Sequence, residues 1–193
     1  MMHQPSAQAL GNVLRKYFQA KDENRPHLLD EVFAPDAILQ ITNKTDTIAF
    51  PSVTNGCQAI ADVLVRRFGQ IYENIYSFYM SRPSEFLTEF SCDWLVGMTE
   101  KENKDVRVGC GRYDWTFREE APHLAKRLVI TIEAMRVLPP NQLQPIIAWI
   151  QRLNYPWTSI TDVIKSAPEI ALLEPVIKYL GRNDNVVRYP DGH

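Results

Sequence analysis

The sequence lacks the features that most often assign a chemistry directly. It has 3 cysteines and 4 histidines in 193 residues. No Cys-x-x-Cys pair or Cys/His ligand spacing occurs, so neither a disulfide framework nor a zinc site is expected. A glycine-rich phosphate loop, a Gly-x-Ser-x-Gly nucleophile motif and a His-Glu-x-x-His metal motif are also missing. We therefore expect no bound metal and no cofactor.

Long apolar runs and an excess of one charge are missing too. No run approaches the roughly 18 apolar residues of a membrane-spanning helix, and the first ten residues lack the basic and apolar regions of a signal peptide. Lys plus Arg number 21 and Asp plus Glu number 23, a net charge of -2. This balance provides no general attraction to nucleic acid or to an anionic membrane. We expect a cytoplasmic protein with neither as a partner.

Three helices and an early hairpin are predicted in the first part of the chain. Apolar residues at helical spacing predict an amphipathic helix over residues 10–18. A second, short helix spans 24–35, where Pro35 ends it. "DAILQI" (36–41) and "TIAF" (47–50) indicate two strands. A capping-box pattern at Asn55 opens a third helix that continues to about residue 72.

The middle of the chain changes to the period of β-structure. Four segments are rich in β-branched and aromatic residues with approximate alternation: 75–81, 85–102, 106–120 and 124–139. Polar turns separate the last three, which predicts an antiparallel meander. After Pro139-Pro140 the helical period returns.

This order of elements predicts an α+β fold, with a curved antiparallel sheet wrapped around the N-terminal helices. Such a sheet leaves a cone-shaped cavity, a natural site for a small molecule. We expect residues 1–140 to form this cone domain, and residues 141–193 to form a C-terminal helical extension packed on it. In the extension, Trp149 and Trp157 are interpreted as packing anchors.

Several segments carry a resemblance to a known family. They are "KYFQAKDENRPHLLDEVFAPDAILQI" (16–41), "NGCQAI" (55–60) and "GRYDWTF" (111–117) followed by "LVITIEAMRVL" (128–138). By this pattern the chain resembles the nuclear transport factor 2-like superfamily, and within it the SnoaL-like group. That superfamily includes ketosteroid isomerases, scytalone dehydratase, polyketide cyclases and members without known catalysis. The resemblance implies a small-molecule ligand in the cone and a homodimer through the outer face of the sheet.

The resemblance also points to individual residues. Tyr17 falls where the ketosteroid isomerases keep the tyrosine of their oxyanion hole, so we expect it to be a catalytic or ligand-binding hydrogen-bond donor. Ile41 falls where they keep the aspartate that moves the proton. Because isoleucine cannot accept a proton, steroid isomerisation by that mechanism is not expected.

The strand at 106–118 has two possible orientations. Alternation places Arg112 and Asp114 on one face and Tyr113, Trp115 and Phe117 on the other. If the aromatic side meets the helices, Arg112 and Asp114 face solvent or a partner subunit. With the reverse orientation they lie in the cavity, where Asp114 is a catalytic candidate and Arg112 a ligand-binding one.

Aromatic residues supply the other ligand-binding candidates, which are Tyr17, Tyr72, Trp94, Tyr113 and Trp115. The alternative is that their rings only fill the cone. Further acid/base candidates are Asp93, Asp36, which more simply serves a turn, and Glu133, which more simply pairs with a basic residue of a neighbouring strand. Three functions stay open: a cofactor-free lyase, isomerase or cyclase, a non-catalytic binding protein, and a dimerisation module.

Overall fold

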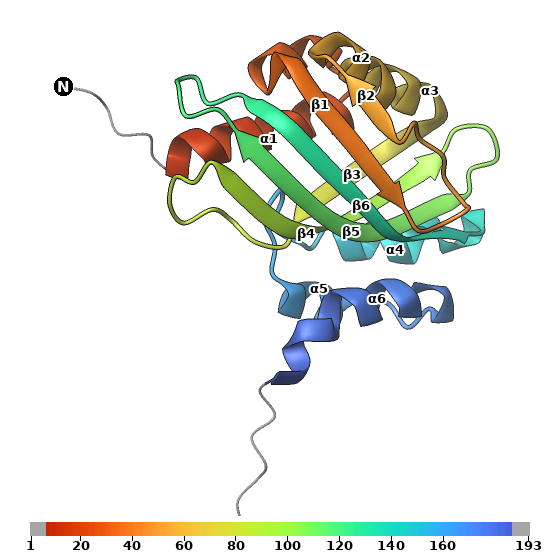
Figure 1. The fold of residues 1–193 in the computed structure, drawn as a ribbon. Helices are drawn as coiled ribbons and strands as arrows, with labels where there is room; N and C mark the ends of the chain where they lie inside the picture. Colours follow the sequence, from red (N-terminus) through yellow and green to blue (C-terminus); the bar gives the residue numbers. More distant parts are fainter. Residues whose placement is uncertain (1–6, 187–193) are drawn as a thin grey trace, which may run out of the picture.

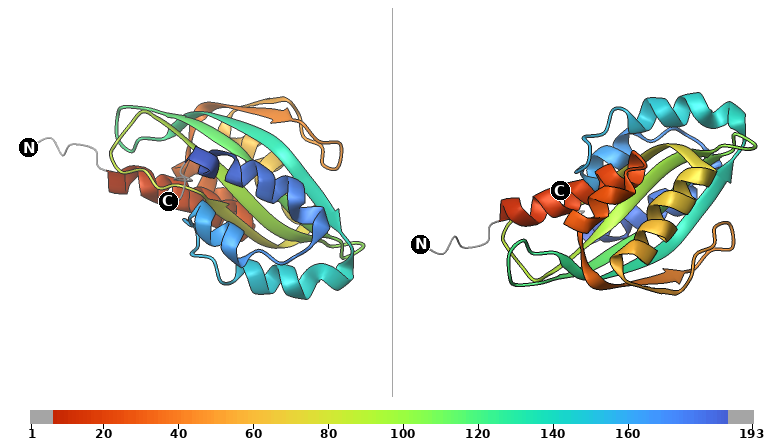
Figure 2. Two further views of the ribbon diagram at one scale, coloured as in Figure 1. Left: turned by 90° about the horizontal axis from the view of Figure 1, so that it is seen from below. Right: turned by 90° about the horizontal axis from the view of Figure 1, so that it is seen from above.

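The computed structural model describes residues 7–186 and has three layers (Figure 1). A six-stranded, curved and unclosed sheet forms the middle layer, with strand order β2-β1-β6-β5-β4-β3. N-terminal helices cover its concave face and C-terminal helices lie on the opposite face (Figure 2). The predicted α+β class and the sheet wrapped around N-terminal helices are confirmed.

The elements have the following bounds. The helical ones are α1 (Ala7–Asp22), η1 (Pro26–Glu31), α2 (Cys57–Ala61), η2 (Asp62–Arg67), α3 (Phe68–Ile71), η3 (Pro140–Gln142), α4 (Leu143–Ile150), α5 (Ile160–Ser166), η4 (Ala171–Leu173), α6 (Glu174–Leu180) and η5 (Gly181–Val186). The strands are β1 (Phe33–Asn43), β2 (Val53–Asn55), β3 (Tyr72–Tyr79), β4 (Glu89–Glu100), β5 (Val106–Phe117) and β6 (Ala125–Leu138). Among the described residues, no helix has the length and apolar character needed to cross a membrane.

The sheet owes its curvature to irregular pairing. Strands β3 to β6 form the predicted antiparallel meander, whereas β1 pairs with β6 in parallel. Register shifts interrupt three of the strand pairs, one of them between Cys110 and Gly111, and such bulges bend a strand. A Cβ at Gly111 would lie 1.8 Å from the carbonyl oxygen of Thr131. Only glycine allows the two backbones to approach this closely.

Three predictions in and next to the early hairpin were wrong. Strand β1 begins at Phe33, and Pro35 lies at a register shift in it instead of ending a helix. A bulge tolerates proline because no ladder hydrogen bond is needed there. The segment 47–50 is not a strand; it belongs to a loop over residues 44–52, and β2 follows it. Nor does Asn55 cap the next helix, since Gly56 stands at the cap position with φ 89°.

The main core lies between the N-terminal helices and the concave face of the sheet. Its largest members are aromatic: Tyr17 and Phe18 on α1, Tyr79 on β3, and Trp115 and Phe117 on β5. Tyr113, Trp115 and Phe117 are all buried on this side. The orientation of β5 with its aromatic side toward the helices is therefore the one observed.

A second core joins the C-terminal helices to the opposite, outer face of the sheet. Apolar residues of β3 to β6 pack there against residues of the extension that include Ile146, Trp149, Val176 and Leu180. An ion pair fixes the extension further along, where Arg182 Nη1 lies 2.9 Å from the buried carboxylate of Asp93. The extension thus covers much of the sheet face that the resemblance assigned to dimerisation.

Candidate functional site

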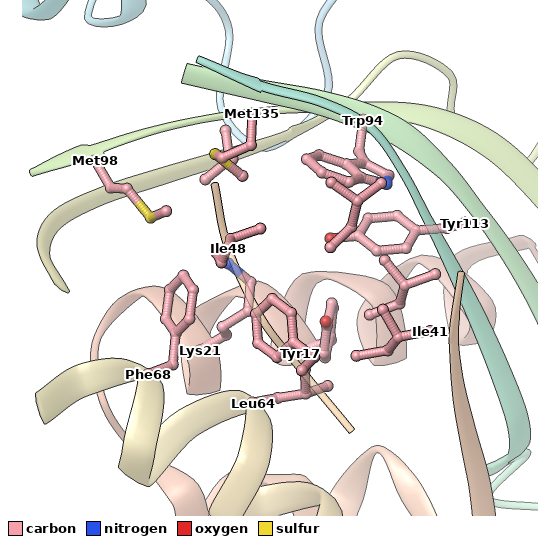
Figure 3. Close-up of a pocket in the computed structure, with 14 residues that line it drawn as sticks. Tyr17, Lys21, Ile41, Ile48, Leu64, Phe68, Trp94, Met98, Tyr113 and Met135 are labelled. Carbon is pink, nitrogen blue, oxygen red and sulfur yellow. The ribbon is translucent and has the colours of Figure 1, made fainter. Parts of the chain in front are cut away.

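A small, mainly apolar cavity of about 50 Å³ lies between helix α1 and the concave face of the sheet (Figure 3). This volume exceeds what one water molecule needs, about 10–15 Å³, and suits a few waters or one end of a ligand. Tyr17 and Lys21 enter it from the helical side, and Trp94 and Tyr113 from the sheet. Its other lining residues are Ile41, Ile48, Phe50, Leu64, Phe68, Val96, Met98, Ile130, Ile132 and Met135.

Two hydrogen-bond donors in this lining have no acceptor. The hydroxyl proton of Tyr17 and the indole N–H of Trp94 are buried and have no acceptor among the described residues. Leaving a buried polar group unpaired costs about 1–3 kcal/mol, so nearly all such groups are paired. Burial raises the pKa of Tyr17 well above its ordinary value; a contact in which the Tyr113 hydroxyl donates toward the Tyr17 oxygen partly offsets this, and the charge of Asp22 adds to it. In that contact Tyr17 is the acceptor, so its own proton is still without an acceptor among the described residues. The phenol therefore stays protonated and can donate.

Lys21 is the only lysine among the described residues that line the cavity. It lies one helical turn beyond Tyr17, and its side chain is 7% exposed. Its Nζ donates to Asp22 Oδ1 at 2.8 Å and to Ser77 Oγ at 2.6 Å. The charge also lies 5.2 Å from the ring centre of Phe68. A buried charge is tolerated when it is paired and hydrogen-bonded, and these contacts meet that requirement.

Asp22 connects Lys21 to the C-terminal extension. Its side chain is 4% exposed and accepts hydrogen bonds from the backbone N–H and the hydroxyl of Ser77, both at 2.8 Å. The hydroxyl of Tyr155, a residue that follows α4, donates to Asp22 Oδ2 at 3.2 Å, whereas Lys21 donates to Oδ1. The extension thereby contributes one group to the network that holds Lys21.

The predicted ligand-binding residues are divided among three places. Tyr17, Trp94 and Tyr113 line the cavity. Trp115 packs edge-on against Tyr17, with ring centres 5.0 Å apart, but does not line the cavity. Tyr72 lines a separate surface groove. The structure therefore brings three of the five aromatic candidates together.

Arg112 and Asp114 lie on the outer face of the sheet, so the cavity placement considered for them was wrong. Because side chains alternate along β5, the burial of Tyr113 and Trp115 turns these two residues outward. Arg112 Nε donates to Asp114 Oδ1 at 3.1 Å, and Ser91 Oγ donates to the same oxygen at 2.6 Å. Both charged side chains are more than 40% exposed.

The remaining acid/base candidates are engaged elsewhere. Asp93 pairs with Arg182, and Asp36 pairs with Arg118 at 2.5 Å instead of serving a turn. Glu133 pairs with Lys44, just beyond the neighbouring strand β1, at 2.7 Å. Of the described residues, none of those lining the cavity is a carboxylate or an imidazole; His3 and His193 lie outside the described residues.

Sequence reasoning missed Lys21, although one signal for it was present. A residue four positions after Tyr17 on a helix shares its face. The hydrogen bond from Lys21 to Ser77 gave no such signal, and neither did the one from Tyr155 to Asp22, because both join residues that are distant in the sequence. Ile41 does line the cavity, so an apolar side chain occupies the position that the resemblance assigned to a proton-transfer aspartate.

No group of three or more His, Cys, Asp or Glu residues in the described part of the chain could hold a metal ion. The thiols of Cys57, Cys92 and Cys110 are free and buried. Burial raises the pKa of Cys57 to about 11 and that of Cys110 to about 12. At neutral pH these thiols are protonated, which makes them weak nucleophiles.

No family model matches the sequence, and no curated protein matches it. Solved structures do. A nuclear transport factor 2-like superfamily protein from Salmonella enterica superposes with a TM-score of 0.54 at 14% identity, over 66% of this chain and 91% of that one. A putative isomerase from Rhodopseudomonas palustris gives 0.53 at 13% identity, over 65% and 90%.

Hexachlorocyclohexane dehydrochlorinase LinA-type3 from Novosphingobium barchaimii gives a TM-score of 0.54 at 11% identity, over 68% of this chain and 88% of that one. At such low identity these likenesses show the fold alone, which is the nuclear transport factor 2-like fold. Placement in the SnoaL-like group stays a prediction. Each similarity covers about two thirds of this chain.

Proposed function

We propose that this chain, with its nuclear transport factor 2-like fold, binds a small, mainly apolar molecule that presents one hydrogen-bond acceptor to the cavity. One observation carries the proposal: two buried donors, Tyr17 Oη and Trp94 Nε1, line the same cavity and have no acceptor among the described residues. A carbonyl oxygen placed beside either donor would remove the cost of leaving that donor unpaired.

The charges around the cavity favour a neutral acceptor. The ammonium of Lys21 is already compensated by Asp22 at 2.8 Å. An anionic group entering the apolar lining would lose its hydration without a free cation to replace it. A ketone, aldehyde or ester oxygen fits better than a carboxylate.

A second candidate function is catalysis without a cofactor, as a lyase, isomerase or cyclase. Its support is the position of Lys21, one turn from Tyr17 in the same lining. The Tyr17 hydroxyl would stabilise negative charge that develops on a substrate oxygen, a role in which fixed donors are most effective. Lys21, whose charge Asp22 compensates, would add one further N–H donor. A putative isomerase and a dehydrochlorinase are among the solved structures of similar fold.

Titration with a matched pair of probes tests the binding proposal. Cyclopentanone and methylenecyclopentane have nearly the same shape, but only the ketone accepts a strong hydrogen bond. We expect the ketone to bind more tightly, and Trp94→Phe to weaken its binding about fivefold, the value of one hydrogen bond. Equal binding of the two probes, or an unchanged affinity in Trp94→Phe, would contradict the proposal.

Homodimerisation through the outer sheet face stays a prediction, now limited to the strip that α4–α6 leave uncovered. That strip contains Arg112 and Asp114, and the exposed apolar side chains of Ile38 and Val53 lie on β1 and β2 at the edge of the same sheet. Light scattering at micromolar concentration tests it; we expect a dimeric mass that Ile38→Asp reduces. A monomeric mass for the unaltered protein would rule the dimer out.

A further inference from the structure

A surface groove of about 390 Å³ adjoins the cavity. It is lined by Thr47, Ile48, Ala49, Phe50, Pro51, Val63, Arg67, Phe68, Ile71, Tyr72 and Glu100. Three of these residues, Ile48, Phe50 and Phe68, also line the cavity. The same side chains therefore form a wall with the cavity on one side and the groove on the other.

Phe50 is the least buried side chain of this wall. Its loop is fixed on one side, where Asn43 Nδ2 donates to the carbonyl of Ile48 at 2.6 Å. On the other side the backbone N–H of Ile41 donates to the carbonyl of Ser52 at 2.9 Å. Between these two points the half-buried ring of Phe50 lies against Phe68, with centres 6.4 Å apart. The ring of Phe50 therefore stands between the cavity and the groove.

Arg67 is an uncompensated cation in this groove. Of the two strongly charged residues in the lining, Glu100 is already paired with Arg107 at 2.8 Å. Arg67 is exposed and makes no ion pair with any described residue. Its neighbour Arg66 differs, because it is paired with Asp62 at 2.8 Å. The groove therefore combines apolar walls with one positive charge that is available to a ligand.

The two volumes suggest a ligand that uses both compartments. Sites for small molecules commonly measure about 300–1,000 Å³, and the cavity of about 50 Å³ is far below that range. The groove, at about 390 Å³, lies within it. A molecule with only its end in the cavity would place the rest of its length in the groove.

We propose that the groove is a second subsite, in which Arg67 binds a carboxylate at the far end of the ligand. This inference rests on the proposed function, because it places the ligand's neutral acceptor beside Tyr17 and Trp94. The ligand class is then an elongated apolar acid with a carbonyl group at the opposite end. An arginine suits this role because its guanidinium can hold both carboxylate oxygens at once.

Straight-chain keto acids with the ketone at the end opposite the carboxylate test the subsite, each compared with its own methyl ester. We expect the acid to bind about fivefold more tightly than the ester, as for a partly exposed ion pair. Arg67→Gln should remove this difference by weakening the acid and leaving the ester unchanged. Arg66→Gln is the matched control and should retain the difference, because Arg66 is already paired.

Equal binding of acid and ester in the unaltered protein would overturn the subsite, as would equal effects of Arg66→Gln and Arg67→Gln. Cyclopentanone separates this failure from failure of the proposed function. If cyclopentanone binds and the acid shows no advantage, only the subsite is wrong. If neither cyclopentanone nor the keto acids bind, both proposals are wrong.

Discussion

Tyr17 and Lys21 lie one turn apart on helix α1 and both line the cavity, but their hydrogen bonding differs. Lys21 donates to two side chains, whereas the proton of the Tyr17 hydroxyl has no acceptor in the described part of the chain. Phenylalanine would fill the same space without burying a hydroxyl. The ligand proposed above would supply the missing acceptor.

Replacing Tyr17 with Phe should not destabilise the protein. The variant removes a buried donor that has no acceptor among the described residues, so we expect the free energy of unfolding to rise by about 1 kcal/mol. Tyr79→Phe is the control, since the Tyr79 hydroxyl donates to the carbonyl of Leu14 at 2.8 Å. That variant should lose about 1 kcal/mol. Urea unfolding measures both, and equal losses would show that Tyr17 has a structural partner.

Removing the charge of one partner in the Lys21–Asp22 ion pair should lower the free energy of unfolding. In Asp22→Asn the buried ammonium of Lys21 loses its charged partner, and we expect a loss of about 3 kcal/mol. The double variant Lys21→Met with Asp22→Asn should recover much of it, because no buried charge is left unpaired. A double variant as unstable as Asp22→Asn would contradict this account of the pair.

The contribution of the extension to this network can be measured at Tyr155. Tyr155→Phe removes its hydrogen bond to Asp22 and should lower the free energy of unfolding by about 1 kcal/mol. Its ring, which packs edge-on against Phe78 at 5.8 Å, stays in place. If this hydrogen bond helps to hold the Lys21 side chain in place, the NMR signal of Lys21 Cε should shift in the variant. An unchanged signal would limit Tyr155 to a local role.

Replacing each of two glycines with alanine should change the stability of the protein in opposite directions. A Cβ at Gly111 would lie 1.8 Å from the Thr131 carbonyl oxygen and 2.8 Å from the Trp94 ring, so Gly111→Ala should cost about 3 kcal/mol. Gly11 lies inside α1, where an added Cβ would be in ordinary contact with the Trp157 ring at 3.9 Å, so Gly11→Ala should stabilise by about 1 kcal/mol. Thermal unfolding of both variants checks the bend of the sheet at Gly111; a tolerated Gly111→Ala would argue against it.

Stability should fall in alkaline solution because burial raises the pKa of thiols. The pKa of Cys110 rises from 9.0 to about 12, and that of Cys57 from 9.0 to about 11. Above pH 9 the unfolded chain releases these protons while the folded one retains them, so stability present below pH 9 is lost as the pH rises toward 11 and 12. Urea unfolding between pH 7 and pH 10.5 should show this fall, and Cys110→Ala should make it shallower; an unchanged slope would contradict the assignment to Cys110.

The sequence predicted those features that depend on local periodicity. Alternation placed Tyr113 and Trp115 on one face of β5, and the resemblance placed Tyr17 on the helix that enters the cone. The local pattern gave a wrong prediction at residues 47–50, whose β-branched and aromatic residues are typical of a strand. There Ile48 and Phe50 direct their side chains toward the cavity instead of pairing with a neighbouring strand.

Contacts between distant segments could not be read from the sequence. The anchoring of Lys21 depends on Ser77, 56 positions away, and Asp22 meets Tyr155 133 positions away. Periodicity also predicted helices after residue 140 without indicating which sheet face they would cover. That face is chosen by complementary apolar surfaces, as where Trp149 packs in the outer core, and no local pattern contains this information.

Methyl NMR in the presence of cyclopentanone tests the central claim most directly. Ile41, Ile48, Met98 and Met135 line the cavity, whereas Ile146 and Ile150 belong to the outer core. The account predicts that the ketone shifts the methyl signals of the first group and leaves those of the second unchanged, and that Tyr17→Phe weakens the effect. Shifts confined to the outer core, or no shifts at a saturating concentration of the ketone, would contradict a ligand site in the cone.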